Sequence, residues 1–446
     1  MRQPPHVLVI SWWFPPLTEG GVYRPLNFVR HLQRSGVRVT VLTGCPPSSA
    51  RQDASLLERL PEGVQILRCP HWNPFDFYDA FKRRRAKHSM AAAGAVARVA
   101  DEDTDTPAPM GLRDRLSEPF AVPDKWRSWV APATWLASTR LLGDEPDLIF
   151  STSPPHSVQL VGAELASRFR CPWVVDFRDP WVDNPFRGFR VPAMLKRDQA
   201  MEAEVVAQAT QIVANTRALE RRFRGRFEGL ERVRTIPNGF AADTVLGEPL
   251  ADPQPPYRLV HVGHIYGLRS GRYLLQALDR LRQQQPEVAA ALRIELVGAL
   301  ENQEDYLRQV RELGLESQLT WHGTVSHAEA LAKQRQAHGL LILGVESQEP
   351  EIQVPGKIYE YFAARRPVVS LSRSGGAILE TLQDARFPHV QAEPDDVDGI
   401  ARALQAFVEG QQTGALSEFG DACIETYRYD RLTAQLLDCF EDAWAC

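Results

Sequence analysis

Lys357 and Glu360 stand three positions apart, directly after Pro355-Gly356, a pair of residues that turns the chain. This pattern predicts a helix that begins at about Lys357 and ends near Ala364. The N-terminus of such a helix presents free backbone N–H groups and a positive dipole end, which suit a phosphate. Lys357 would add a point charge beside the backbone of Gly356, and Glu360 could accept hydrogen bonds from a sugar diol. The alternative is an ordinary helix start with a solvent-exposed Lys–Glu pair.

Two further cationic candidates follow an apolar run in the same half of the chain. The run Arg258–Val262 predicts a buried strand, and the loop after it contains His264 and Arg269. Because an arginine can grip a phosphate through two N–H groups at once, Arg269 is suited to neutralise phosphate charge at a strand end. His264 is a lesser candidate for the same ligand. The alternative for Arg269 is a loop arginine in solvent.

The first half of the chain carries a glycine pair in a comparable place. Gly20 and Gly21 follow the apolar run Val7–Ile10, and Tyr23–Gln33 has the apolar spacing of a helix. Glycine lets the backbone approach a ligand closely, and the following helix would offer its N-terminus. Arg24 faces the same end of that helix. These residues are candidates for ligand binding, although turns also use glycine pairs.

Polar side chains end two more apolar runs of the first half. His156 follows one run, and Asp176 and Asp179 end the other. Ligands of parallel sheets bind at the carboxyl ends of strands, so we expect these side chains to face a ligand. Asp176 or Asp179 could orient a reacting hydroxyl. An equally open alternative is a structural ion pair between Arg178 and Asp179 beneath Trp181.

Continuous apolar runs of strand length must position these groups. Runs of this kind are covered on both faces, which predicts parallel sheets with helices between the strands. The first series comprises Val7–Ile10, Val37–Leu42, Asp147–Ser151, Trp173–Asp176, Gln211–Ala214 and Val233–Ile236, and the second comprises Arg258–Val262, Arg293–Val297, Leu319–Trp321, Gly339–Leu343 and Pro367–Ser370. The proline-rich segment Leu246–Pro256 between them is typical of a linker. The sequence therefore predicts an α/β protein with two doubly wound, Rossmann-like domains that face each other across a cleft.

We expect a first domain over residues 1–245, a second over 257–425, and a C-terminal helix within 426–446. An insertion at about 72–123 interrupts the alternation of predicted strands and helices in the first domain. Its basic run Lys82–Arg85 is either a solvated helix face or a contact for anionic lipid head groups.

Two acidic segments have the D-x-D spacing found in some metal-binding sites. Asp101–Asp105 lies in the polar insertion with no strand leading into it, which indicates a solvated turn. Asp396 and Asp398 open a helix, where acidic residues are expected as caps. We therefore predict no metal site.

Composition narrows the functional class. The 446 residues carry a net charge of -5, which gives no reason to expect nucleic acid. Six cysteines lack C-x-x-C spacing, which favours reduced thiols in a cytoplasmic protein. No apolar run approaches the roughly 18 residues that span a bilayer. We expect a cytoplasmic protein, and peripheral association with the inner face of the membrane stays open.

These motifs together resemble glycosyltransferase family 4, the retaining nucleotide-sugar enzymes with the GT-B fold, from about Val7 to Leu437. The resemblance implies that Glu360 binds the ribose of the donor. Many members carry a second Glu eight residues earlier, where this chain has Ile352, with Glu351 beside it. In some members a Lys precedes the Glu, as Lys357 does here.

The resemblance also suggests roles for the other candidates. The loop with Gly20 and Gly21 would lie beside the donor phosphates and the acceptor. Members typically have an Arg where this chain has His264, and a Lys close to the position of Arg269; both cations hold the diphosphate. A His of the first domain, for which His156 is the loose match, would approach the transferred sugar.

The implied activity is retaining, metal-independent transfer from a nucleoside diphosphate sugar to a saccharide, lipid-linked or small-molecule acceptor. No cofactor is expected. Many relatives act in surface polysaccharide or glycoconjugate biosynthesis, and their last helix crosses back to the first domain. Two alternatives remain open at this point: a non-catalytic GT-B module that binds sugar nucleotide beside an active partner, and a sugar-nucleotide epimerase.

Overall fold

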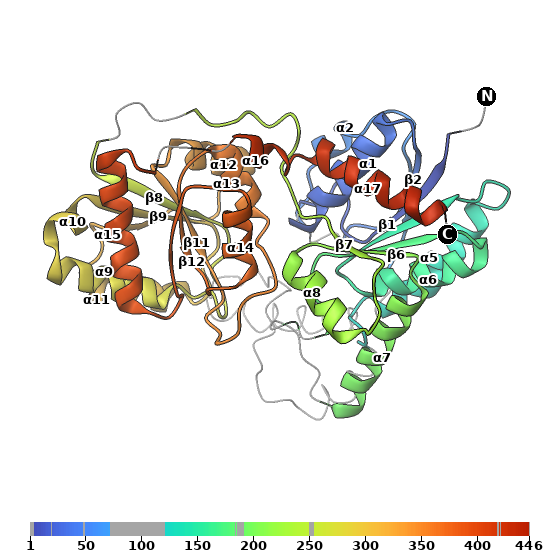
Figure 1. Cartoon of the computed structure of the whole chain (residues 1–446), viewed down its shortest axis with the longest axis horizontal. Coiled ribbons are helices and arrows are strands. Elements are labelled where there is room, and N and C mark those ends of the chain that lie inside the picture. The colour runs from blue at the N-terminus through green and yellow to red at the C-terminus, as the bar shows by residue number, and fades with distance from the viewer. Residues whose placement is uncertain are drawn as a thin grey trace, which may run out of the picture. The chain divides into compact units, whose positions relative to one another are not determined.

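The computed structural model describes residues 4–18, 20–47, 50–71, 121–182, 184, 191–248, 254–416, 419 and 421–445. These residues form two compact units, each built on one parallel sheet (Figure 1). The first unit contains residues up to Asn215, Leu219–Ile236 and Thr433–Cys446, and the second contains Thr216–Ala218 and Pro237–Leu432. Lys82–Arg85 and Asp101–Asp105 lie outside the described residues.

The first unit has a seven-stranded sheet in the order β3-β2-β1-β4-β5-β6-β7. Its strands are β1 (His6–Ser11), β2 (Arg38–Gly44), β3 (Gln65–Cys69), β4 (Leu148–Ser153), β5 (Trp173–Phe177), β6 (Gln211–Ala214) and β7 (Val233–Thr235). All adjacent strands pair in parallel. Every residue of β1, β4 and β5 is buried, as expected for apolar strands covered on both faces.

Helices connect these strands. They are η1 (Gly20–Val22), α1 (Tyr23–Arg34), α2 (Ser55–Glu58), η3 (Arg127–Trp129), α5 (Val130–Arg140), α6 (Ser157–Phe169), α7 (Pro192–Gln208) and α8 (Arg217–Arg226). The helix α1 begins at Tyr23, two residues after Gly21, and nine of its twelve residues are buried. It therefore carries Arg24 into the interior of the unit.

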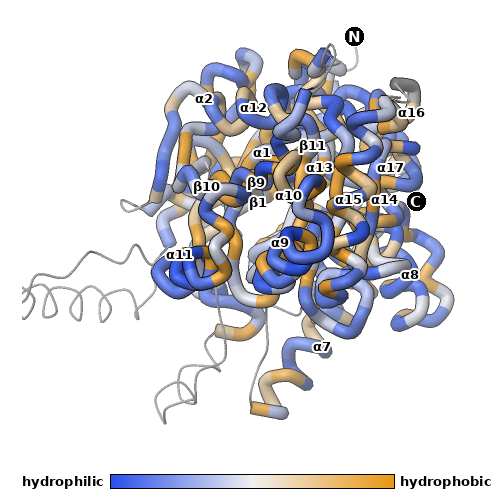
Figure 2. Tube along the Cα trace, turned by 90° about the vertical axis from the view of Figure 1, so that its left-hand side faces the viewer, coloured by the Kyte–Doolittle hydropathy of each residue, from blue (hydrophilic) through white to orange (hydrophobic). Residues whose placement is uncertain are grey.

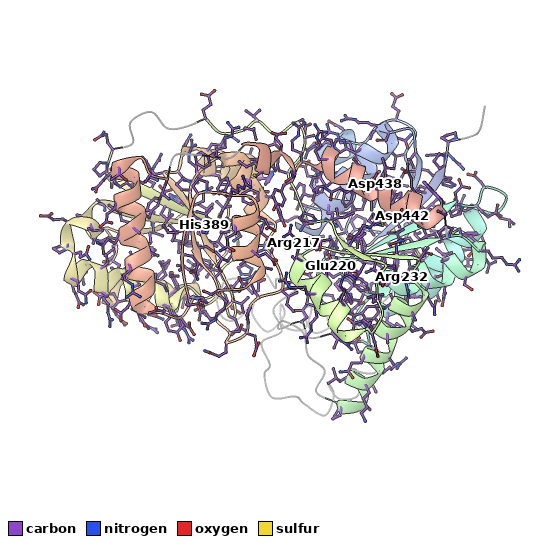
Figure 3. All side chains as sticks on the ribbon, viewed as in Figure 1. Arg217, Glu220, Arg232, His389, Asp438 and Asp442 are labelled. Carbon is purple, nitrogen blue, oxygen red and sulfur yellow. The ribbon has the colours of Figure 1, made fainter. Side chains whose placement is uncertain are left out.

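The last helix, α17 (Tyr429–Trp444), packs its C-terminal part on the first unit. The ring of Phe440 lies 5.7 Å from that of Phe150 in β4, and Trp444 donates a hydrogen bond to the carbonyl of Asp147. Asp442, labelled on this helix in Figure 3, pairs with Arg234 of β7.

The second unit has a six-stranded parallel sheet in the order β10-β9-β8-β11-β12-β13. Its strands are β8 (Tyr257–Val262), β9 (Leu292–Val297), β10 (Leu319–Trp321), β11 (Gly339–Leu343), β12 (Val368–Leu371) and β13 (His389–Ala392). Its helices are α9 (Arg272–Gln284), α10 (Pro286–Ala290), α11 (Gln303–Glu312), α12 (His327–Gln336), α13 (Lys357–Ala364), α14 (Ala377–Asp384), α15 (Val397–Thr413) and α16 (Asp421–Glu425). The sequence-based prediction of a helix from Lys357 to Ala364 is confirmed.

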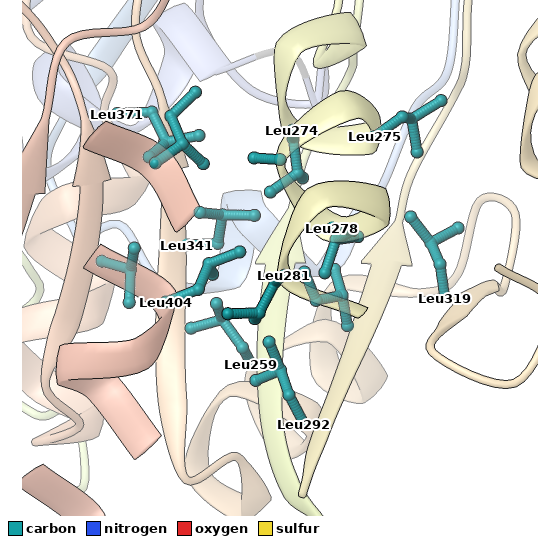
Figure 4. Close-up of a cluster of buried hydrophobic side chains, with 14 of the residues drawn as sticks. Leu259, Leu274, Leu275, Leu278, Leu281, Leu292, Leu319, Leu341, Leu371 and Leu404 are labelled. Carbon is teal, nitrogen blue, oxygen red and sulfur yellow. The ribbon is translucent and has the colours of Figure 1, made fainter. Parts of the chain in front are cut away.

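A leucine-rich core fills one side of this sheet. Side chains from the strands of this sheet meet those of α9 and α15 there (Figure 4), among them Leu259, Leu278, Leu341 and Leu404. The buried positions of α9 recur every three or four residues, whereas its other positions are largely hydrophilic (Figure 2). This packing holds the carboxyl ends of β8 and β11 in fixed places.

The chain changes units before the proline-rich segment, at Ile236 and Pro237 rather than at 245. Residues after this point hydrogen-bond to the second unit: Phe240 N–H donates to Tyr427, and Gly247 N–H donates to Ala363. These backbone bonds explain why residues 237–248 pack with the second unit.

Asp396 and Asp398 stand at the start of α15, as expected from the sequence. Asp396 occupies the N-cap position but makes no side-chain capping bond, and Asp398 pairs with Arg280. No helix in the described residues has both the length and the apolar composition needed to cross a membrane.

Candidate functional site

The second unit has its topological switch point between β8 and β11, where the strand order reverses. Ligands of open parallel sheets bind outside the carboxyl ends of strands at such a point. The loop after β8 carries His264 and Arg269, and the segment after β11 leads into α13 and Lys357. The topology therefore brings these sequence-predicted residues to one edge of one sheet.

Lys357 begins α13 and turns back toward β8. Its Nζ lies 3.1 Å from Nε2 of His261, the fifth residue of β8. Gly263 makes room for the amine, since a Cβ at that position would come within 2.5 Å of Nζ. Burial and the nearby charge of Arg269 lower the pKa of Lys357 to about 7, while the carboxylate of Glu360 acts in the opposite direction. A cation that is so poorly solvated favours an anionic partner.

Arg269 belongs to the same cluster. Its charge also lowers the pKa of His261 and that of Glu351, although burial dominates both shifts and raises the pKa of the carboxyl. The loop that carries Arg269 is anchored by Glu346, whose side chain is 6% exposed and accepts hydrogen bonds from the backbone and hydroxyl of Ser270 at 3.2 and 2.7 Å. The backbone of Glu346 also donates to the carbonyl of Leu268. The cation is thus presented on an anchored loop.

Glu360 lies one turn after Lys357 and is half-buried. Its Oε2 accepts a hydrogen bond of 3.0 Å from Nε2 of Gln334, a fully buried residue of α12. This contact restricts the carboxylate before any ligand arrives. A carboxylate held in one orientation can accept hydrogen bonds from a diol with little further loss of side-chain freedom.

Glu351 has a different role from that of Glu360. It is buried, accepts a hydrogen bond from the backbone of Arg373, and lies over Gly376, where a Cβ would come within 2.6 Å of its carboxyl carbon. Burial raises the pKa of this carboxyl. Glu351 thus packs against the start of α14.

In the first unit the switch point lies between β1 and β4. The glycine pair follows β1, and His156 follows β4. Gly21 is in close contact with Trp13, since a Cβ there would come within 2.9 Å of the indole. Arg178 donates to the carbonyls of Gly21, Ser153 and Pro154, so it fastens the two loops to each other.

Arg24 is buried and forms a two-pronged ion pair with Asp176, with N···O distances of 2.9 and 2.8 Å. It also donates to the carbonyl of Ile236 at 2.8 Å, and Thr152 donates to Asp176 at 2.6 Å. The prediction grouped Arg24 with donor-binding residues and Asp176 with hydroxyl-orienting ones. These contacts instead hold α1 to β5. Removing either partner would leave the other as an unpaired buried charge, which is strongly destabilising.

His156 is buried, and its ring stacks on that of Trp181 with centroids 4.8 Å apart. The indole N–H of Trp181 donates to Asp198 at 2.7 Å. Asp179 lies half-buried just before this tryptophan. The guanidinium of Arg178 donates to the backbone carbonyls already described, which fix this arginine, and the ion pair between Arg178 and Asp179 stays a prediction.

Two domain models match the sequence. Residues 19–239 match the "Glycosyl transferase 4-like domain", and residues 256–409 match "Glycosyl transferases group 1". The chain belongs to the GT-B glycosyltransferases. The first match covers most of the first sheet and the second match covers the second sheet. Each domain of this glycosyltransferase therefore has a Rossmann-like sheet with its own switch point.

The glycosyltransferase is similar to several characterised proteins at low identity. Glycogen synthase of Mycobacterium tuberculosis is 22% identical over 409 residues, which are 90% of this chain and 86% of that protein. Sucrose-phosphate synthase from Thermosynechococcus elongatus is 14% identical, with a TM-score of 0.65 over 99% of both chains. Anabaena HepE, solved with UDP and glucose, is 16% identical, with a TM-score of 0.61 over 98% of this chain and 99% of that one. The solved structures show the shared fold.

Two donor-binding candidates of the glycosyltransferase occupy the rim of the second switch point. Gly356 is exposed at the N-cap position of α13, and nothing lies within 4 Å of a Cβ placed there. The ring of His264 lies 4.8 Å from that of Tyr266 in the loop after β8. Both residues therefore remain candidates for phosphate contacts.

A group of aromatic side chains in the first unit went unnoticed in the sequence. Trp12 contacts Trp126 and Trp129 with ring centroids 5.7 and 5.4 Å apart, and Trp13 contacts Trp126 at 5.8 Å. Lys125 lies over the ring of Trp126, 4.6 Å from its centroid. The pair Trp12-Trp13 directly after a strand was the available signal. Trp13 and Trp126 are half-buried, so each presents part of its ring at the carboxyl end of β1.

Proposed function

We propose that this glycosyltransferase binds a nucleoside diphosphate sugar at the switch point of its second unit, with the phosphates at the N-terminus of α13. The observation that carries the proposal is that Lys357 and Arg269 lie at one sheet edge, near enough for the charge of Arg269 to lower the pKa of Lys357. Two cations next to free helix N–H groups form a site for a diphosphate. Gly356 and His264 stand on the rim of the same site.

We assign the donor ribose to Glu360. The carboxylate lies one turn along the helix from Lys357, so a nucleotide with its phosphates at the helix start would bring its ribose near it. Gln334 holds Oε2, which supports a fixed orientation for a diol. HepE has been solved with UDP-glucose, so UDP sugars are the first donors to test.

Transfer passes through an oxocarbenium-like state while negative charge collects on the departing diphosphate. Groups fixed where that charge develops stabilise the transition state more than the ground state. In our proposal Arg269, Lys357 and the N–H groups of α13 supply this stabilisation without a metal ion. We propose retention at the anomeric carbon, in keeping with the family resemblance.

The first unit would hold the acceptor, which we propose to be a saccharide, a lipid-linked saccharide or a small molecule. Its switch point presents the glycine pair, His156, Asp179 and the aromatic rings of Trp13 and Trp126. We propose surface polysaccharide or glycoconjugate assembly as the biological setting. Lys82–Arg85 would give the enzyme a peripheral contact with anionic lipid.

The test is a transfer assay with a panel of UDP, GDP, ADP and dTDP sugars, with and without acceptors. We expect release of a nucleoside diphosphate that depends on acceptor, a product with the donor's anomeric configuration by NMR, and full activity in EDTA. Turnover of the sugar nucleotide without acceptor would indicate an epimerase. Donor binding without turnover on any acceptor would indicate a non-catalytic module. Loss of activity in EDTA that magnesium or manganese restores would contradict the metal-free mechanism.

A further inference from the structure

His261 stands in the middle of the proposed donor site, yet no motif drew attention to it. It lies in β8 between the apolar residues Val260 and Val262 and is 1% exposed. A buried polar side chain must find hydrogen-bond partners inside the protein. The partners of His261 lie on two other elements, β11 and α13, so the ring joins the three elements that meet at the switch point.

The pairing of β8 with β11 shows why the ring lies there. The two strands are in register at Gly339–Leu259 and Leu340–Val260. The carbonyl of Leu341, the next residue of β11, contacts two side chains. Nδ1 of His261 lies 2.9 Å from its oxygen, and the hydroxyl of Tyr361 donates a hydrogen bond to it at 3.3 Å. His261 thus fills the place where the two strands begin to separate.

These contacts determine the proton on the ring. A carbonyl oxygen only accepts hydrogen bonds, so Nδ1 of His261 must carry the proton. In the neutral ring Nε2 then holds a lone pair, which can accept a hydrogen bond from the ammonium of Lys357. Burial, together with the charges of Lys357 and Arg269, lowers the pKa of His261 well below its usual value and keeps the ring neutral.

We propose that His261 is a positioning residue, which holds the Lys357 ammonium at the donor diphosphate by accepting its hydrogen bond through Nε2. The inference rests on the proposed function, in which Lys357 contacts the diphosphate. Gly263, whose φ is +130°, leaves space for the amine in this position, because a Cβ there would come within 2.5 Å of Nζ. The charged groups facing the amine are Arg269 from the loop after β8 and Glu360 from α13.

Two substitutions separate the functions of the ring nitrogens. In His261→Gln the amide reaches the position of Nε2 and can still accept from Lys357. In His261→Asn the shorter amide reaches the position of Nδ1, so it can donate to Leu341 but leaves the ammonium without its acceptor. His338→Asn is the matched control, because His338 is a half-buried histidine of the same unit whose Nδ1 accepts from the backbone of Arg258.

The first measurement needs no ligand. The chain has six lysines, Lys82, Lys87, Lys125, Lys196, Lys333 and Lys357, so a spectrum of protein labelled with 13C at the lysine ε-carbon is simple, and Lys357→Arg assigns the signal. We expect Lys357 to titrate near pH 7 in the wild type, in His261→Gln and in His338→Asn. In His261→Asn the pKa should fall, because a hydrogen bond to the charged form has been lost. An unchanged pKa in His261→Asn would overturn the proposal.

The second measurement is calorimetric binding of UDP, GDP and ADP to the full chain between pH 6 and 8. For the tightest of them we expect His261→Asn to weaken binding about tenfold at pH 7, and His261→Gln by much less. The loss should grow with pH as Lys357 loses its proton. Lys357→Ala separates the two hypotheses. Unchanged nucleotide affinity in Lys357→Ala would refute the proposed donor site, whereas weakened binding in Lys357→Ala with normal binding in both His261 variants would refute only the positioning role.

Discussion

Glu360→Ala tests whether Glu360 binds the donor ribose. The two contacts of its carboxylate predict how far the substitution should lower donor affinity and protein stability. The first is the proposed bond to the ribose diol. A hydrogen bond to a charged group contributes roughly 1.5–3 kcal/mol, so its loss should weaken donor binding about tenfold to a hundredfold. The second is the bond from Gln334 at 3.0 Å. Because Gln334 is fully buried, removing its acceptor should also lower the free energy of unfolding by about 1–3 kcal/mol.

A milder variant separates these effects. Glu360→Gln keeps a side-chain oxygen that can accept from Gln334, and it removes only the charge. We expect it to leave the free energy of unfolding almost unchanged and to weaken donor binding by about tenfold or less, the difference between a charged and a neutral hydrogen bond. Donor affinity is measured by calorimetry, and stability by urea denaturation of the same samples.

The matched control is Glu409→Ala. Glu409 accepts a hydrogen bond of 2.7 Å from Gln405 on α15, the same type of contact that Glu360 makes with Gln334, but on an exposed helix face. It should alter neither donor affinity nor turnover. Wild-type donor affinity in both Glu360 variants would refute the ribose assignment, and Glu360 would then be a residue that only supports α12 and α13.

Three more predictions follow. Lys357→Met should lower the turnover number more than donor affinity, since charge on the diphosphate grows toward the transition state, and it should raise the thermal unfolding temperature below pH 7. An unchanged kcat with a raised KM for the donor, or a lower unfolding temperature below pH 7, would contradict this. Trp126→Ala should raise the KM for acceptor and leave donor affinity unchanged, and the reverse pattern in initial-rate kinetics would remove the aromatic rings from the acceptor site. Changing Lys82–Arg85 to Ser should weaken binding to anionic vesicles, most visibly at low salt, without altering turnover on a soluble acceptor, and an unchanged vesicle affinity in co-sedimentation would exclude the lipid contact.

Much of the fold could be predicted because its strands are buried on both faces. A run such as Val7–Ile10 is apolar at every position, as expected for a strand covered on both faces. Two strands were missed. Both β3 and β13 carry partly exposed polar residues, such as Arg68 and His389, because each lies at an edge of its sheet.

The candidate site could be predicted only where its residues adjoin one another in sequence. The start of α13 brings Lys357 and Glu360 together within one turn. In contrast, the contact between Lys357 and His261 joins residues 96 positions apart, and that between Arg24 and Asp176 joins residues 152 apart. Such pairs depend on the order of the strands in the sheet, and a local sequence pattern does not reveal that order. Arg24 was therefore grouped with ligand-binding residues, although its charge is already paired inside the unit.

The state of Lys357 shows how the site balances stability against function. Its pKa falls from 10.5 in an exposed lysine to about 7 in the folded protein, so the unfolded chain binds more protons between these two pH values. The free energy of unfolding should therefore rise with pH across this interval, and the penalty for the buried charge is fully present below pH 7. A methionine of similar length carries no such penalty, and its advantage in stability should shrink above pH 7. A bound diphosphate acts in the opposite direction, because an adjacent negative charge favours the ammonium and raises its pKa. Donor binding at pH 8 should then take up a proton from solution. In our proposal the attraction between the diphosphate and the Lys357 ammonium offsets the unfavourable free energy of burying that ammonium in the empty protein.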